Sequence, residues 1–119
     1  MLANDIVQKL NATALGVWNK NLMNKDYNYV FATDLMSDAL AMINNSCDKT
    51  VLLTGLCNAQ SLRTAEMLDL ELIIYVRGKT LDESVLQLAM EMGFNVFKTD
   101  YSMFEACGIL YEAGIKASD

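Results

Sequence analysis

The 119-residue chain contains no histidine. Histidine is the usual general base beside a serine or cysteine nucleophile, and it is a frequent ligand of transition metals. Its absence excludes Ser–His and Cys–His nucleophile pairs and every histidine-ligated metal centre. Carboxylates, lysine, tyrosine or cysteine would have to carry any acid–base chemistry, and we predict neither a metal site nor a cofactor.

Cysteine is scarce, and no pair of cysteines has the spacing of a metal or redox motif. Cys47, Cys57 and Cys107 are odd in number and widely separated, which argues against a disulfide framework and a zinc knuckle. The chain also has no apolar run of the roughly 20 residues that span a bilayer, and no basic stretch followed by an apolar one at its N-terminus. We therefore expect reduced, mostly buried thiols in a cytoplasmic protein with no membrane partner.

Basic residues are outnumbered. Nine Lys and Arg stand against 15 Asp and Glu, which gives a net charge of -6. Because proteins that bind nucleic acid neutralise its phosphates with clustered basic residues, nucleic acid is not an expected partner. Hydrophobic residues make up 53% of the chain and include eight Met. This apolar excess predicts that some surface meets a second subunit, and we expect a homodimer.

Apolar runs alternate with amphipathic segments along the chain. The pattern predicts strands at 13–17, 29–32, 51–54, 72–76 and 95–98, and helices at 5–10, 34–43, 58–68, 81–92 and 101–113. Residues 19–28 are expected to form a polar loop. Short continuous apolar strands are typical of parallel sheets covered on both faces. The sequence therefore predicts an α/β fold in three layers, with a mostly parallel sheet flanked by helices, as one domain over residues 1–119.

The segment "IIYVRGKT" ends as a nucleotide-binding phosphate loop ends. Such a loop needs a glycine five residues before its second glycine, but Ile73 occupies that position, inside the expected strand. Thr80 and Glu83 instead have the spacing of a capping box, and Gly93 stands where a left-handed residue would end the helix. We interpret the segment as a strand-to-helix turn in which Lys79 is solvated.

Three other groups of residues suggest sites. Asp34 and Asp38 are expected on one side of a helix, where they could hold a hard cation or only complement the helix dipole. Cys57 precedes a helix but has no neighbouring base. Ser102 with Glu105 forms another possible capping box, and Thr99 or Asp100 could instead cap a helix that starts one turn earlier.

The carboxyl ends of parallel strands meet helix N-termini at one edge of a sheet, where ligands commonly bind. Arg77 is the cation of this predicted edge, and its planar guanidinium suits phosphate or carboxylate. The alternative is that these residues only form turns. The candidate ligand-binding residues are Thr54, Gly55, Asn58, Arg77, Gly78 and Thr99.

Three segments resemble a known family. "YVFATDLMSDAL", "VLLTGLCNAQSLRTAEMLDLELIIYVRGK" and "TDYSMFEACGILYEAGI" are similar to the small stand-alone DRTGG-domain proteins of anaerobic bacteria. The family's Gly-Asp-Arg turn aligns with Gly55-Leu56-Cys57, and its Thr-Gly-Gly turn aligns with Val76-Arg77-Gly78. Of the signature, Gly55 and Gly78 remain.

The resemblance implies a regulatory role. DRTGG domains also occur in some phosphotransacetylases and beside CBS domains in some inorganic pyrophosphatases, and they resemble the N-terminal, non-catalytic domain of HPr kinase. By this resemblance the chain is a non-catalytic, homodimeric module that senses a nucleotide or another anionic metabolite and acts through a protein partner. The alternative is an enzyme, or an enzyme subunit, that acts on an anionic metabolite.

Overall fold

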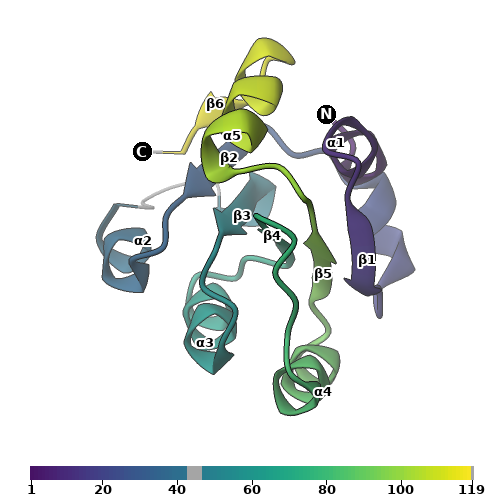
Figure 1. Cartoon of the computed structure of the whole chain (residues 1–119), viewed down its shortest axis with the longest axis vertical. Coiled ribbons are helices and arrows are strands. Elements are labelled where there is room, and N and C mark those ends of the chain that lie inside the picture. Colours follow the sequence, from purple (N-terminus) through teal and green to yellow (C-terminus); the bar gives the residue numbers. More distant parts are fainter. Residues whose placement is uncertain (43–46, 119) are drawn as a thin grey trace.

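The structure is a computed structural model that describes residues 1–42 and 47–118. Strands and helices alternate along most of the chain (Figure 1). The strands are β1 (Thr13–Gly16), β2 (Tyr29–Ala32), β3 (Thr50–Thr54), β4 (Leu72–Tyr75), β5 (Asn95–Lys98) and β6 (Lys116–Ala117). The α-helices are α1 (Ala3–Lys9), α2 (Met36–Met42), α3 (Ala59–Met67), α4 (Glu83–Met92) and α5 (Met103–Glu112), and η1 (Lys20–Asn24) and η2 (Cys47–Lys49) are short 3-10 helices.

The strands form one six-stranded sheet in the order β1-β5-β4-β3-β2-β6. Strands β5, β4, β3, β2 and β6 run parallel, and β1 pairs with β5 in the antiparallel direction. Central strands β3 and β4 are buried along their whole length. Their apolar residues are needed on both faces because helices cover the sheet on both sides.

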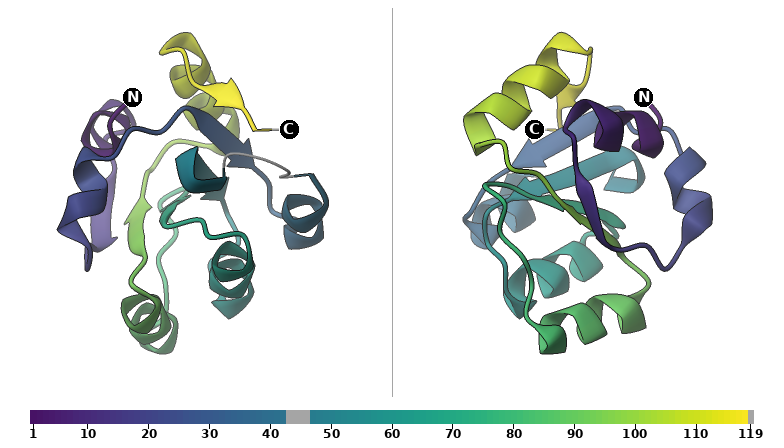
Figure 2. Two further views of the ribbon diagram at one scale, coloured as in Figure 1. Left: turned by 180° about the vertical axis from the view of Figure 1, so that it is seen from behind. Right: turned by 45° about the vertical axis from the view of Figure 1, so that its right-hand side comes forward.

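Helices α2, α3 and α4 cover one face of the sheet, and α1 and α5 cover the other (Figures 1 and 2). Alternate residues of each central strand point into the two resulting cores. In β4, Ile73 and Tyr75 pack under α2, α3 and α4, whereas Leu72 and Ile74 pack under α1 and α5. The three-layer α/β fold with a mostly parallel sheet is therefore confirmed.

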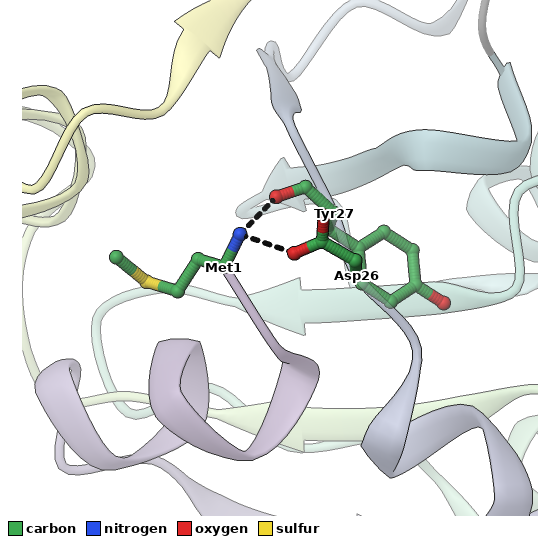
Figure 3. Close-up of polar contacts among 3 residues, drawn as sticks. All are labelled: Met1, Asp26 and Tyr27. Atoms are coloured by element: carbon green, nitrogen blue, oxygen red, sulfur yellow. Dashed lines mark hydrogen bonds and ion pairs between the residues drawn. The ribbon is translucent and has the colours of Figure 1, made fainter.

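The N-terminal segment is joined to the sheet by polar contacts. The Met1 ammonium donates to the Asp26 carboxylate at 2.6 Å and to the Tyr27 carbonyl at 3.0 Å (Figure 3). The buried side chain of Asn95 accepts from the backbone N–H groups of Trp18 and Asn19 and donates to the Asn19 carbonyl. The three hydrogen bonds of Asn95 hold the segment after β1 against β5.

The helix ends confirm two of the expected caps and correct a third. Gly93 ends α4 with a φ of 76°, and Ser102 with Glu105 forms the capping box of α5. The capping box expected at Thr80 is wrong, because α4 begins at Glu83 with Asp82 as its N-cap and no side-chain cap bond. Leu81 is buried in the core before the helix begins, and the N-cap Asp82 has an extended backbone.

Other differences are small and local. The helix expected from residue 34 begins at Met36, because Asp34 is bonded to another loop and the Thr33 hydroxyl accepts from the Leu35 N–H. The expected end of that helix, Ile43, lies outside the described residues. The loop expected at 19–28 contains η1, and the two-residue strand β6 was not predicted. Within the described part of the chain, no helix is long and apolar enough to cross a membrane.

Candidate functional site

The adjacent parallel strands β3, β4 and β5 bring their carboxyl ends to one edge of the sheet. Backbone hydrogen bonds continue past the strands, since the Val76 N–H donates to the Thr54 carbonyl and the Thr99 N–H donates to the Tyr75 carbonyl. The loops that follow the three strands are therefore joined to one another. This edge carries the candidate residues that follow β3, β4 and β5.

Asp34 organises the loop that follows β3. Its Oδ1 accepts from the Gly55 N–H at 2.6 Å and from the Thr54 hydroxyl at 3.4 Å. A Cβ atom on residue 55 would lie 3.1 Å from the same oxygen, so the close approach favours glycine. The polar groups of Thr54 and Gly55 thus have partners inside the protein. Asp34 was missed at this site, although it follows the end of β2 as the other candidates follow their strands.

Asn58 begins helix α3. Its side chain accepts from the Ser61 N–H at 3.3 Å, which makes it the N-cap of a nine-residue helix. The backbone N–H groups of Ala59 and Gln60 have no hydrogen-bond partner within the described residues. The positive end of the helix dipole therefore lies at this edge of the sheet.

The turn after β4 presents Arg77. Arg77 and Gly78 both have left-handed backbone conformations, with φ of 64° and 65°. Their N–H groups donate to the carbonyls of Tyr101 at 2.8 Å and Thr99 at 2.7 Å. A Cβ atom on residue 78 would lie 2.7 Å from an Asp100 oxygen, so glycine is needed for both space and conformation.

The Arg77 side chain is exposed, and within the part of the chain that the structure describes it has no ion pair or hydrogen bond. The turn that carries it is held by two backbone bonds, so the position of its Cα is well defined. A guanidinium in this state can form a bidentate contact with an anion without breaking an existing bond.

Lys79 is exposed, as expected of a turn residue, but its side chain also has a protein partner. Its ammonium donates to the Gly55 carbonyl at 3.0 Å and so links the loops that follow β4 and β3. Sequence reasoning missed this second cation because the bond joins residues 24 positions apart. The edge therefore carries two cationic groups, of which Lys79 already has a protein partner.

Thr99 is buried, with 1% of its surface exposed. Its hydroxyl donates to the Leu10 carbonyl at 2.6 Å and accepts from the Tyr101 N–H. These bonds join β5 to the end of α1. A depression of about 240 Å³ lies beside it, lined by Leu10, Asn11, Thr99, Asp100 and Tyr101.

Cys57 lies in the loop after β3, and Tyr75 is the last residue of β4. Both side chains are protonated at neutral pH. Burial raises the pKa of the Cys57 thiol, and Asp34 adds to this effect while Lys79 opposes it. Burial raises the pKa of Tyr75 to about 12, although the hydrogen bond with the Ser61 hydroxyl at 2.8 Å lowers it. Neither group is an activated nucleophile or a base near pH 7.

The expectation that Asp34 and Asp38 lie on one side of a helix is wrong, because Asp34 precedes α2 and is bonded to Gly55. Asp38 lies in the first turn of α2, as the helix-dipole alternative requires. Among the described residues, no group of three or more Cys, Asp and Glu is arranged to hold a metal ion.

Comparisons with known proteins support the fold. No family model matches the chain, and no curated protein matches it in sequence. A solved structure of the CBS and DRTGG domains of the regulatory region of Clostridium perfringens pyrophosphatase, complexed with the activator diadenosine tetraphosphate, is similar with a TM-score of 0.68 and 18% identity. The match covers 90% of this chain and 44% of that one. The expected resemblance to a DRTGG-type domain is confirmed at the level of the fold.

Proposed function

We propose that the chain is a non-catalytic regulatory module that senses a nucleotide or another anionic metabolite at the carboxyl edge of its sheet. The observation that carries the proposal is the Arg77 guanidinium, which stands on a fixed turn without an intramolecular partner among the described residues. It shares this edge with the N-terminus of α3 and with Lys79. Three positive groups at one edge suit a ligand with more than one anionic oxygen.

The candidate residues have different roles in this proposal. Arg77 and the N-terminus of α3, capped by Asn58, contact the anion. Thr54 and Thr99 hold the loops in place through their buried hydroxyl groups, and Gly55 and Gly78 allow the close packing of those loops. The ligand therefore contacts few of the side chains that the sequence indicated.

The chemistry of the side chains at this edge supports a regulatory role over a catalytic one. The chain has no histidine, and burial raises the pKa values of Cys57 and Tyr75. The pyrophosphatase whose regulatory region has a similar fold is bound by a nucleotide activator. We propose that this chain likewise responds to an anion, acts as a cytoplasmic homodimer and passes the signal to a protein partner.

A thermal-shift screen combined with turnover assays tests this function. The probes are ATP, diadenosine tetraphosphate and inorganic phosphate, each measured with and without Mg²⁺. We expect at least one nucleotide to raise the melting temperature while its concentration stays constant over hours of incubation. Metal-dependent consumption of the probe would support the alternative of an enzyme, and the absence of a shift with every probe would contradict ligand sensing.

A further inference from the structure

Helix α5 carries an exposed apolar stripe on the side away from the sheet. Phe104 is 87% exposed and Tyr111 is 78% exposed, whereas Ala106 and Leu110 on the opposite side of the helix are fully buried. Positions 104, 107, 108 and 111 share one face because they recur at helical spacing. Two aromatic rings that are almost completely exposed on one helix face are typical of a surface that meets a partner.

The stripe borders a groove of about 590 Å³ between α5 and the edge of the sheet at β2. Of the described residues that line this groove, Asp38 is the one charged side chain. Phe104 and Tyr111 line it from the helix, and Phe31 and Ala32 line it from the strand. An apolar side chain suits this groove better than an anionic ligand does.

Gly108 lies in the middle of the stripe, and none of the described residues requires a glycine there. A Cβ atom at this position would meet no atom within 4 Å, and the backbone is an ordinary helix. Glycine in the middle of a helix destabilises the helix relative to alanine. A small residue between two exposed aromatics allows another backbone to approach closely.

The spacing of the stripe identifies its occupant. Positions 104 and 111 lie at equal distances from the midpoint between Cys107 and Gly108. If two copies of α5 cross in opposite directions at this midpoint, Phe104 of each copy meets Tyr111 of the other, and Gly108 of each copy faces Cys107 of the other. A twofold axis requires this self-complementary arrangement, in which the same patch serves both partners.

The available area is consistent with a dimer. A stable interface buries roughly 800 Å² on each partner. Phe104 and Tyr111 together supply about half of this area, because an aromatic side chain buries about 150–250 Å². The groove walls and Leu35, which is 58% exposed and is bonded through its backbone to Thr33 of the groove, supply further apolar surface.

We infer that the apolar stripe of α5 and its groove form a twofold interface with a second copy of this chain. The inference rests on the homodimer in the proposed function and identifies its surface, and it does not depend on the ligand. The anion site at Arg77 belongs to loops at the carboxyl edge, and Arg77 does not line the groove.

Sedimentation velocity of three variants tests the interface. The wild type is expected to sediment with twice the chain mass of 13.2 kDa. Gly108→Gln introduces a long side chain at the crossing point and should stay folded, because the position is open and Gln is a good helix former. This variant and Phe104→Ala should dimerise at least tenfold more weakly. Met67→Gln, a matched change at a 71% exposed residue of α3, should leave the dimer unchanged.

Far-UV circular dichroism of each variant checks that the fold is retained. If both α5 variants dimerise as tightly as the wild type, the interface is wrong while the proposed dimer stands. If the wild type has the mass of one chain at 100 µM, the dimer and its interface both fail. Anion binding, measured in the same samples, separates these failures from a failure of the ligand-sensing proposal.

Discussion

At the scale of single residues, two buried tyrosines have contrasting environments. Tyr27 packs in the core under α1 and α5, and its hydroxyl has no hydrogen-bond partner within the described residues. Tyr75 packs in the opposite core, and its hydroxyl is 2.8 Å from that of Ser61. An unsatisfied buried hydroxyl destabilises a fold by about 1–3 kcal/mol, whereas a satisfied one contributes about 1 kcal/mol.

The two Tyr→Phe substitutions are therefore expected to have opposite effects. Tyr27→Phe removes the unsatisfied hydroxyl and should raise the free energy of unfolding by about 1 kcal/mol. Tyr75→Phe removes a hydrogen bond and should lower it by about 1 kcal/mol. Urea unfolding at pH 7 measures both. A loss of stability in Tyr27→Phe would mean that its hydroxyl has a partner.

Alkaline pH provides a second comparison of the same residues. Burial raises the pKa of Tyr27 to about 12, with a contribution from Glu71, and that of Tyr75 to about 12. The folded state holds these two protons more tightly than the unfolded state does. Their contribution to the free energy of unfolding is therefore complete below pH 10 and is lost as the pH rises towards 12. Each Phe variant should therefore lose stability less steeply between pH 10 and 12 than the wild type. Parallel curves for wild type and variants would contradict the two shifts.

Some residues of the site could be predicted from the sequence, and others could not. Arg77 and Gly78 follow an apolar strand directly, and this local signal was sufficient to place them. The link from Lys79 to Gly55 joins two loops, and no local pattern reports such a contact. The hydrogen bond that the Thr99 hydroxyl donates goes to Leu10 at the end of α1, which is 89 residues away in the chain.

At the scale of secondary structure, the start of α5 is fixed by a capping box, whereas α4 starts without a side-chain cap bond. Ser102 accepts from the Glu105 N–H at 3.2 Å, and Glu105 reaches back to the Ser102 N–H. Ser102→Ala should therefore lower the free energy of unfolding by about 1 kcal/mol. Thr80→Ala also removes a hydroxyl group, but Thr80 lies outside α4 and does not cap it. This substitution should leave the free energy of unfolding nearly unchanged. Thermal unfolding of both variants checks this. Equal destabilisation by both would show that Thr80 does cap α4 in solution.

Strands could be predicted from the sequence where an apolar run is also buried in the sheet. Strands β3 and β4 are buried along their whole length, β5 is buried except at its last residue, and β2 is half-buried apart from Phe31. The expected positions of all four strands were confirmed with small differences at the ends. Strand β6 has only two residues, Lys116 and Ala117, both exposed. Such a strand exists through its pairing with β2, and its own sequence carries no signal for it.

At the scale of the whole molecule, the order of the strands decides which loops meet. The alternation of strands and helices predicted a parallel sheet, but it did not predict that β5 lies between β4 and the antiparallel strand β1. The same topology leaves α5 beside the edge formed by β2 and β6 (Figure 2). The apolar stripe of α5 borders the groove at this edge. The apolar excess of the chain predicted an exposed apolar surface, and the position of the stripe on α5 could be found only from the fold.

In the proposed function, the chain senses an anion through Arg77. Calorimetric titration of the nucleotide that gives the largest thermal shift, into wild type, Arg77→Ala and Arg63→Ala, tests it most directly. Arg63 is also exposed but lies in the middle of α3, so its substitution removes the same charge at a distance from the edge. We predict that Arg77→Ala weakens binding at least tenfold, about 1.4 kcal/mol, while Arg63→Ala binds as the wild type does. Equal affinity in all three proteins, with each of them folded, would contradict the claim.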